Sequence, residues 1–198
     1  MRRFLGIDYL YESLRNMEEF DIKLKFLGKI DEENALMFLN NLKSLNDKYP
    51  NSSSLTIYIS SSGGNVDMAV ELYHFLRLLK CKIRTVNISY VNSASIILFS
   101  AGTERFCFPN SSFYLHPITK KLDGKFSYND LYKEAKEMAT NTDNMAEILM
   151  RSSHKNKSYW KRLINKGYLL TSKKANEIGF SKILSENELG KNFQCDIL

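Results

Sequence analysis

A serine and a histidine, two residue types that cooperate in hydrolysis, follow predicted strands near the middle of the chain. Ser93 lies 29 residues after the end of the double glycine Gly63-Gly64 and 23 residues before His116. A serine hydroxyl becomes a nucleophile when a neighbouring imidazole takes its proton, and backbone amides can bind the oxyanion that forms. These residues therefore predict three parts of a serine-hydrolase site: a nucleophile, a base and a backbone donor loop.

Each of these features also has a purely structural explanation. A double glycine after a strand fits a turn that needs positive φ angles, and a serine that opens a helix is most often its N-cap. His116 fits a strand-end histidine held by backbone hydrogen bonds. Ser95 offers a second hydroxyl two positions after Ser93, and the residue pattern alone does not choose between the two serines.

The elements that would position these residues alternate between strand and helix. Alternation of this kind indicates parallel βαβ units and an α/β fold. Residues 60–64 are predicted to form a tight turn between a strand and a helix. Hydrophobic periodicity predicts strands over 22–27, 55–59, 83–88, 104–108, 112–115 and 181–184, and helices over 31–49, 66–79, 93–100, 131–150, 157–165 and 172–178.

Length and composition bound the class of protein. The chain has 198 residues, which is enough for one domain with a substantial core. It is 43% hydrophobic and 25% charged, which excludes a disordered chain, and no apolar run is long enough to span a membrane. Asp8 interrupts any signal-peptide core, so we expect a cytoplasmic protein without a membrane partner.

The cysteines and the net charge exclude two further classes. Cys81, Cys107 and Cys195 are odd in number and widely spaced, so they indicate neither a disulfide framework nor a zinc site, and we expect no metal and no cofactor. The formal net charge is +6, with the densest basic region at 155–174. Because the basic residues are otherwise scattered, they favour a solvated surface over a nucleic-acid interface.

Six segments, in this order along the chain, make it resemble the proteolytic subunit of the ATP-dependent Clp protease. The resemblance extends from about residue 23 to residue 184, with small gaps. It implies an α/β fold of the ClpP/crotonase-like type, a ββα superhelix with stacked βαβ units and a protruding handle helix. The segments are Phe26-Leu27-Gly28-Lys29-Ile30-Asp31, Tyr58-Ile59-Ser60-Ser61-Ser62-Gly63-Gly64, Ser100-Ala101-Gly102, Arg105-Phe106-Cys107-Phe108-Pro109-Asn110-Ser111, Leu115-His116-Pro117 and Tyr168-Leu169-Leu170-Thr171-Ser172.

The same resemblance divides the chain and assigns site residues. It implies a ClpP-like domain over 21–185 with the handle at about 128–150, a poorly matched N-terminal segment over 1–20 and a C-terminal tail over 186–198. It further implies that Ser93, and not Ser95, is the nucleophile and that His116 is the base. The backbone amides of Gly64 and Ala94 would then form the oxyanion hole.

The third member of the family's triad is missing from the sequence. The family carries an aspartate at the position that Gly167 occupies here, and no Asp or Glu occurs anywhere from Ile148 to Asn176. Asn165 is the only nearby polar residue that could orient His116 in its place. In a well-studied serine protease, replacing the orienting carboxylate lowers turnover by about 10⁴-fold.

Three functions compete on this basis. The first is an active serine endopeptidase that uses Ser93 and His116 on unfolded polypeptides, with Asn165 or a water as the orienter. The second is a catalytically weak or inactive Clp-like structural subunit, which Gly167 favours. The third, a crotonase-type acyl-CoA enzyme, needs an acid or base near the oxyanion site, and the matching loops hold no such carboxylate.

The resemblance also implies partners. We expect a homo-oligomer or a mixed Clp-like assembly of seven-membered rings stacked face to face, served by an AAA+ unfoldase. The predicted handle leaves apolar residues that favour a partner, namely Leu131, Ala135, Met138, Met145, Ile148 and Leu149. A peptide substrate would bind as an added strand near Gly64 and residues 122–125.

Overall fold

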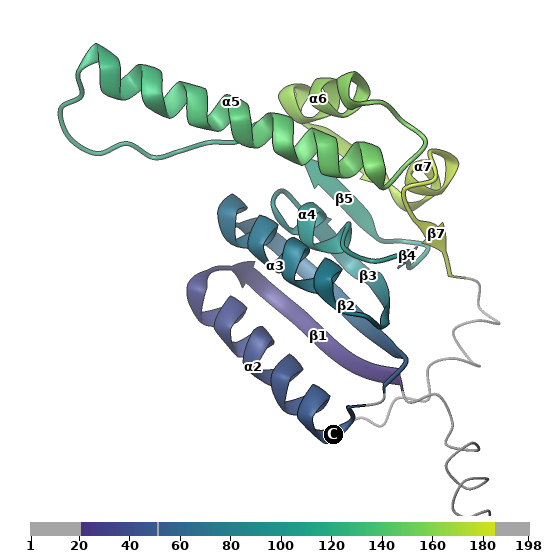
Figure 1. The fold of residues 1–198 in the computed structure, drawn as a ribbon. Coiled ribbons are helices and arrows are strands. Elements are labelled where there is room, and N and C mark those ends of the chain that lie inside the picture. The colour runs from purple at the N-terminus through teal and green to yellow at the C-terminus, as the bar shows by residue number, and fades with distance from the viewer. Residues whose placement is uncertain (1–20, 51, 185–198) are drawn as a thin grey trace, which may run out of the picture.

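The computed structural model describes residues 21–50 and 52–184. Predicted segments 1–20 and 186–198 lie outside the described residues. Within the described part, strands and helices alternate along the first half of the chain, as the sequence predicts (Figure 1). The elements are β1 (Asp21–Ile30), α2 (Glu32–Lys48), β2 (Ser54–Gly64), α3 (Val66–Leu78), β3 (Lys82–Asn92), α4 (Ser95–Phe99), β4 (Glu104–Cys107), β5 (Ser112–Leu115), α5 (Tyr128–Arg151), α6 (Lys157–Lys166), β6 (Tyr168–Thr171), α7 (Ser172–Glu177) and β7 (Lys182–Ile183).

The strands form one mostly parallel sheet in the order β1-β2-β3-β4-β7, with β5 pairing with β3 and β6. The β3 strand pairs with β2 along one edge. Along its other edge it pairs first with β4 and then with β5. Arg84–Asn87 lie beside β4, and Tyr90–Asn92 lie beside β5. Both of these pairings are parallel, so the carboxyl ends of β3 and β5 lie next to each other. This is the place in the fold where Ser93 and His116 leave their strands.

Three sequence-based expectations need correction. The predicted turn over 60–64 is wrong, because β2 continues to Gly64, which pairs with Ile30 of β1. The predicted helix over 93–100 is shorter, because Ser93 adopts a φ of 55° that is incompatible with a right-handed helix. The strand β6 was not predicted, and it runs antiparallel to β5, so the sheet is not wholly parallel.

Helix caps and an aromatic cluster explain why the elements form where they do. The side chain of Asp31 accepts a hydrogen bond from the Asn34 amide at 3.0 Å, so Asp31 is the N-cap of α2. Below the ends of β3 and β5 lies a buried cluster of aromatic rings that join α4, β5 and the C-terminal elements. Its members, with ring centroids 5.0–5.6 Å apart, are Phe99, Phe113, Trp160 and Phe180.

The long helix α5 is only partly covered by the rest of the domain. A capping box between Ser127 and Asp130 starts it, which explains why the helix begins earlier than the apolar periodicity predicts. Its buried residues all lie in the C-terminal half, from Met145 to Leu149. Figure 1 shows the N-terminal half extending beyond the sheet, as expected for a protruding handle.

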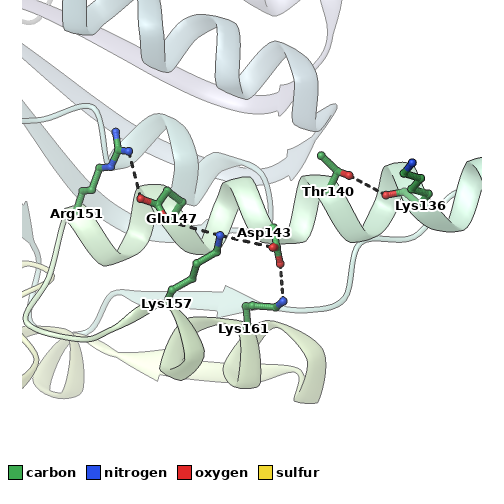
Figure 2. Close-up of polar contacts among 7 residues, drawn as sticks. All are labelled: Lys136, Thr140, Asp143, Glu147, Arg151, Lys157 and Lys161. Carbon is green, nitrogen blue, oxygen red and sulfur yellow. Dashed lines mark hydrogen bonds and ion pairs between the residues drawn. The ribbon is translucent and has the colours of Figure 1, made fainter.

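A ladder of ion pairs holds the covered half of α5 against α6 (Figure 2). Asp143 pairs with Lys161 and, at 3.5 Å, with Lys157. Glu147 in turn pairs with Lys157 at 3.7 Å and with Arg151 at 3.2 Å. Single exposed ion pairs contribute little to stability, so the ladder mainly fixes how the two helices lie against each other.

Over 21–50 and 52–184, no helix is both long enough and apolar enough to cross a bilayer. In the same residues, no three His, Cys, Asp or Glu side chains gather in a way that could hold a metal ion.

Candidate active site

Ser93 has a backbone conformation that sets it apart from the rest of the described chain. Its φ of 55° makes it the one non-glycine residue with a positive φ within residues 21–50 and 52–184. Such a conformation costs on the order of 1–3 kcal/mol and persists only where the surroundings impose it. Here the Ser93 amide donates a 2.7 Å hydrogen bond to the carbonyl of Tyr114 on β5. Ser93 therefore occupies a sharp turn between a strand and a helix, where nucleophilic serines are often presented.

Gly63 packs directly against this turn. A Cβ atom at Gly63 would lie 2.6 Å from the Cβ of Ser93 and 2.7 Å from the carbonyl oxygen of Asn92, closer than real Cβ atoms approach. A Cβ at Gly64 would collide with the carbonyl oxygen of Ile30 on β1. Both glycines are therefore required by close backbone approach, and they bring the end of β2 beside Ser93.

The two candidate serines differ in what their hydroxyls do. Ser95 is fully buried, and its hydroxyl lies 2.6 Å from the carbonyl oxygen of Asn92 and 3.2 Å from that of Ser61. Ser93 is half-buried, and its hydroxyl has no hydrogen-bond partner among the described residues. Geometry thus favours Ser93 as the reactive hydroxyl, because the Ser95 hydroxyl is already engaged in holding the turn.

His116 follows β5, and its imidazole is held by its own backbone. The ring Nδ1 lies 2.7 Å from the carbonyl oxygen of Pro117. A carbonyl oxygen can only accept, so this contact favours, in a neutral ring, the tautomer that carries its proton on Nδ1 and leaves Nε2 as the acceptor. The ring of Tyr114 lies beside the imidazole, with centroids 5.7 Å apart and planes 33° apart. Within the described chain, no hydrogen bond joins His116 to Ser93, although their strand ends are adjacent.

Gly167, which the resemblance matches to the family's aspartate, lies beside the end of β5. It ends α6 with a φ of 71°, and the next residue, Tyr168, pairs with Leu115 across β5 and β6. A Cβ at this position would lie 3.6 Å from the Tyr114 hydroxyl oxygen. In residues 21–50 and 52–184, no Asp or Glu forms an ion pair with His116. The described contacts of the His116 ring are therefore a backbone carbonyl and a tyrosine ring.

The structure brings most, but not all, of the predicted site residues together. Asn165 lies on the exposed side of α6, where it lines a groove against α5 with Thr140, Asp143 and Lys161. The hydrogen bond at Nδ1 of His116 goes to Pro117 instead. Asn165 as an orienter of the imidazole therefore stays a prediction.

Sequence reasoning missed two residues that join the serine and histidine segments. The Asn92 side chain accepts a 3.0 Å hydrogen bond from the Tyr114 amide, and Tyr114 contacts the imidazole of His116. The signal for Tyr114 was available: residues two apart in an extended chain lie on one face, so Tyr114 and the first residue after β5, His116, were expected on the same side. No comparable pattern marks Asn92, whose role depends on the pairing of β3 with β5.

The described cysteines do not compete as nucleophiles. Burial raises the pKa of the Cys107 thiol, and hydrogen bonds from Ser111 and Ser181 offset this only in part. Burial likewise raises the pKa of the half-buried Cys81 thiol. Because the thiolate is the reactive form, both side chains are held in their unreactive state.

Comparison with known proteins gives a consistent result. Residues 10–187 match the model of the Clp protease family. The ATP-dependent Clp protease proteolytic subunit of Carsonella ruddii is 33% identical over 133 residues, which are 66% of this chain and 66% of that protein. The ATP-dependent Clp protease proteolytic subunit 1 of Corynebacterium diphtheriae is 29% identical over 164 residues, covering 81% of this chain and 77% of that protein.

A solved structure gives the same fold. A variant of ClpP1 from Listeria monocytogenes superposes with a TM-score of 0.73 at 20% sequence identity, over 91% of this chain and 99% of that one. At that sequence identity, the structural similarity is evidence for the fold only. It confirms the predicted ClpP-like α/β architecture.

Proposed function

The chain belongs to the Clp protease family, and on that premise we propose that it is a serine-type endopeptidase subunit of a Clp-like proteolytic complex. Its substrates are peptide bonds of unfolded polypeptides. The observation that carries the proposal is the strained turn at Ser93, whose amide is bonded to β5 two residues before His116. Strain of this kind is maintained at functional sites because it presents a reactive group.

In the proposed reaction, Ser93 Oγ attacks the scissile carbonyl carbon while its proton passes to Nε2 of His116. The oxyanion of the tetrahedral intermediate is bound by the backbone amides of Gly64 and Ala94, each worth on the order of 3 kcal/mol in comparable enzymes. Collapse breaks the C–N bond, and the leaving amine takes the proton from His116. Water then attacks the acyl-enzyme by the same proton route and restores the Ser93 hydroxyl.

The carbonyl of Pro117 contributes by fixing which ring nitrogen is the base. It accepts from Nδ1 and so leaves Nε2 free for the serine proton. A neutral carbonyl compensates the charge of an imidazolium less well than a carboxylate does. Turnover below that of a complete triad is therefore expected, by up to about 10⁴-fold.

A second candidate follows from Gly167. With no carboxylate beside His116 in the described chain, the subunit would be catalytically weak or inactive and would act as a structural member of a mixed ring. In either case the proposed assembly is a pair of stacked seven-membered rings, homo-oligomeric or mixed, with α5 as the contact between rings and an AAA+ unfoldase as the feeding partner.

A fluorophosphonate probe, which reacts with activated serines, distinguishes the two candidates. The assembled protein should be labelled on the peptide that contains Ser93, and Ser93→Ala should abolish the label. His116→Gln should slow labelling without unfolding the protein. A wild-type protein that stays unlabelled, while a control serine hydrolase in the same tube is labelled, would overturn the peptidase proposal in favour of the structural subunit.

A further inference from the structure

The imidazole of His116 has two described contacts that could fix its orientation, and one of them is a side chain. Its Nδ1 edge bonds to the Pro117 carbonyl at 2.7 Å. The ring of Tyr114 lies beside it, at a centroid distance of 5.7 Å and an interplanar angle of 33°. An aromatic ring at this distance restricts rotation of the imidazole and can attract the positive charge that the imidazole acquires when it takes a proton.

Tyr114 is itself held rigidly by the segment that carries the serine. Its amide donates to the Asn92 side chain at 3.0 Å, and its carbonyl accepts from the Ser93 amide at 2.7 Å. Both backbone groups of Tyr114 are thus bonded to consecutive residues at the end of β3. A ring carried by such a backbone is placed in a fixed relation to Ser93 and His116 at once.

Gly167 leaves room for this arrangement. A Cβ at residue 167 would lie 3.6 Å from the Tyr114 hydroxyl oxygen, which is an ordinary van der Waals contact. The φ of 71° further disfavours a side chain at this position. The absence of a side chain at 167 and the presence of the large ring at 114 are therefore complementary.

We propose that Tyr114 is a positioning residue for His116: its ring face holds the imidazole and stabilises the imidazolium, in a site where Gly167 provides no carboxylate. This inference rests on the proposed function, because positioning matters only if His116 takes a proton from Ser93. The ring, and not the hydroxyl, carries the role, since the hydroxyl has no hydrogen bond to any described residue.

The test compares Tyr114→Leu, which removes the ring, with Tyr114→Phe, which keeps it. Tyr90→Leu is the matched control, because Tyr90 is 40% exposed against 41% for Tyr114 and has no described contact with His116. Two quantities are measured on the full chain: the rate at which a fluorophosphonate labels Ser93, and the ¹⁵N signals of the His116 ring, which report its tautomer. The chain has three histidines, so His116→Gln assigns those signals.

Tyr114→Leu should slow labelling about fivefold and move the ring signals toward a mixture of tautomers, because a contacting aromatic pair contributes roughly 1 kcal/mol. Tyr114→Phe and Tyr90→Leu should stay within about twofold of wild type in rate and keep the wild-type ring signals. Tyr114→Leu with unchanged rate and signals, or Tyr114→Phe as impaired as Tyr114→Leu, would overturn the proposal. Tyr114→Met replaces Tyr114→Leu if thermal melting shows that the leucine variant is unfolded.

The two readouts separate this inference from the proposed function. If wild-type protein is not labelled at all, the peptidase proposal fails, yet the ring signals still report on positioning. Signals that move in Tyr114→Leu and not in Tyr114→Phe would then support the structural role of the ring, whereas signals that do not move would overturn it.

Discussion

The Ser93 amide donates a 2.7 Å hydrogen bond to the carbonyl of Tyr114, two residues before His116. This bond joins the turn after β3 to the last residues of β5. Since the two strands are parallel neighbours, the backbone places the segments that carry Ser93 and His116 next to each other. A site built on strand ends in this way is sensitive to any change that shifts one strand against the other.

Gly63→Ala should damage the site by direct collision with Ser93. The new Cβ would lie 2.6 Å from the Ser93 Cβ, so the turn must shift, at a cost of about 1–3 kcal/mol for overpacking. Labelling of Ser93 should fall by about 10²-fold, as expected for a misplaced nucleophile. Denaturant unfolding and the probe rate measure the two effects.

Gly124→Ala is the control for that change. Gly124 also has a positive φ, of 111°, but a Cβ there would meet no atom within 4 Å. It therefore isolates the cost of the backbone conformation from the cost of the collision. Equal losses in the two variants would contradict the packing argument.

Ser95→Ala should weaken the turn without removing the reactive group. The buried carbonyl of Ser61 and the partly buried carbonyl of Asn92 would lose a donor, which costs about 1–3 kcal/mol. The melting temperature should therefore fall, while the probe still modifies Ser93. Ser100→Ala is a suitable comparison, because the Ser100 hydroxyl is also buried but bonds to its own helix at Ile96. Loss of the modified peptide in Ser95→Ala alone would point to Ser95 as the nucleophile.

Gly167→Asp should raise the rate of Ser93 labelling by more than about tenfold, because a carboxylate beside His116 stabilises the imidazolium. The positive φ at residue 167 should cost about 1 kcal/mol of stability. Gly167→Asn has the same shape and the same backbone cost but no charge. If the Asn and Asp variants react equally fast, the missing charge is not what limits the site.

The ion pairs of Asp143 should make the contact between α5 and α6 sensitive to acid. A hydrogen bond from Lys161 holds the pKa of Asp143 below its ordinary value, with further help from Lys157. A carboxyl whose folded pKa is depressed adds stability above its unfolded pKa and loses it as the pH falls through the folded pKa. The melting temperature of wild-type protein should therefore fall more steeply than that of Asp143→Asn between about pH 5 and about pH 2.

Asp123→Asn provides the comparison for this titration. Asp123 forms an ion pair with Lys121 whose side chains are 77% and 86% exposed. Exposed pairs of this kind contribute little, so the Asp123→Asn profile should follow that of wild type. If Asp143→Asn also follows wild type, the ladder does not stabilise the fold.

Local patterns in the sequence were sufficient for most of the elements. Periodic apolar residues and the Asp31 cap placed α2 and α3, and a double glycine marked a place where the backbone approaches closely. The end of β2 was not predictable, because its last residues are strand only through pairing with β1. The strand β6 was missed for the same reason: four residues carry too little pattern, and β5 alone makes them a strand.

In the candidate site, too, the sequence predicts residue identities better than it predicts long-range contacts. Residue types and their order proposed a serine and a histidine, and the resemblance selected Ser93 over Ser95, but the contacts made by these segments are long-range. The bond from Tyr114 to Asn92 spans 22 residues, and the bond of His116 to Pro117 depends on how the chain leaves β5. The positive φ at Ser93 is imposed by Gly63 and β5 together, so no local window contained it.

The first turns of α5 expose large apolar and aromatic side chains, which affects the stability of the helix there. Tyr128, Leu131 and Tyr132 are 79%, 48% and 59% exposed, and the two tyrosine rings stack at 6.2 Å. Lys120 forms ion pairs with Glu134 and Glu137 on this half of the helix, but little apolar surface covers its first turns. Helical segments with so little tertiary cover are only marginally stable in water. The helical and unfolded states of these first turns of α5 are therefore close in free energy. Any surface that packs against them would favour the helical state. The helicity of these first turns should therefore depend on whether a partner surface covers them. Amide hydrogen exchange at residues 128–138 should be slow when a partner is bound and fast when none is.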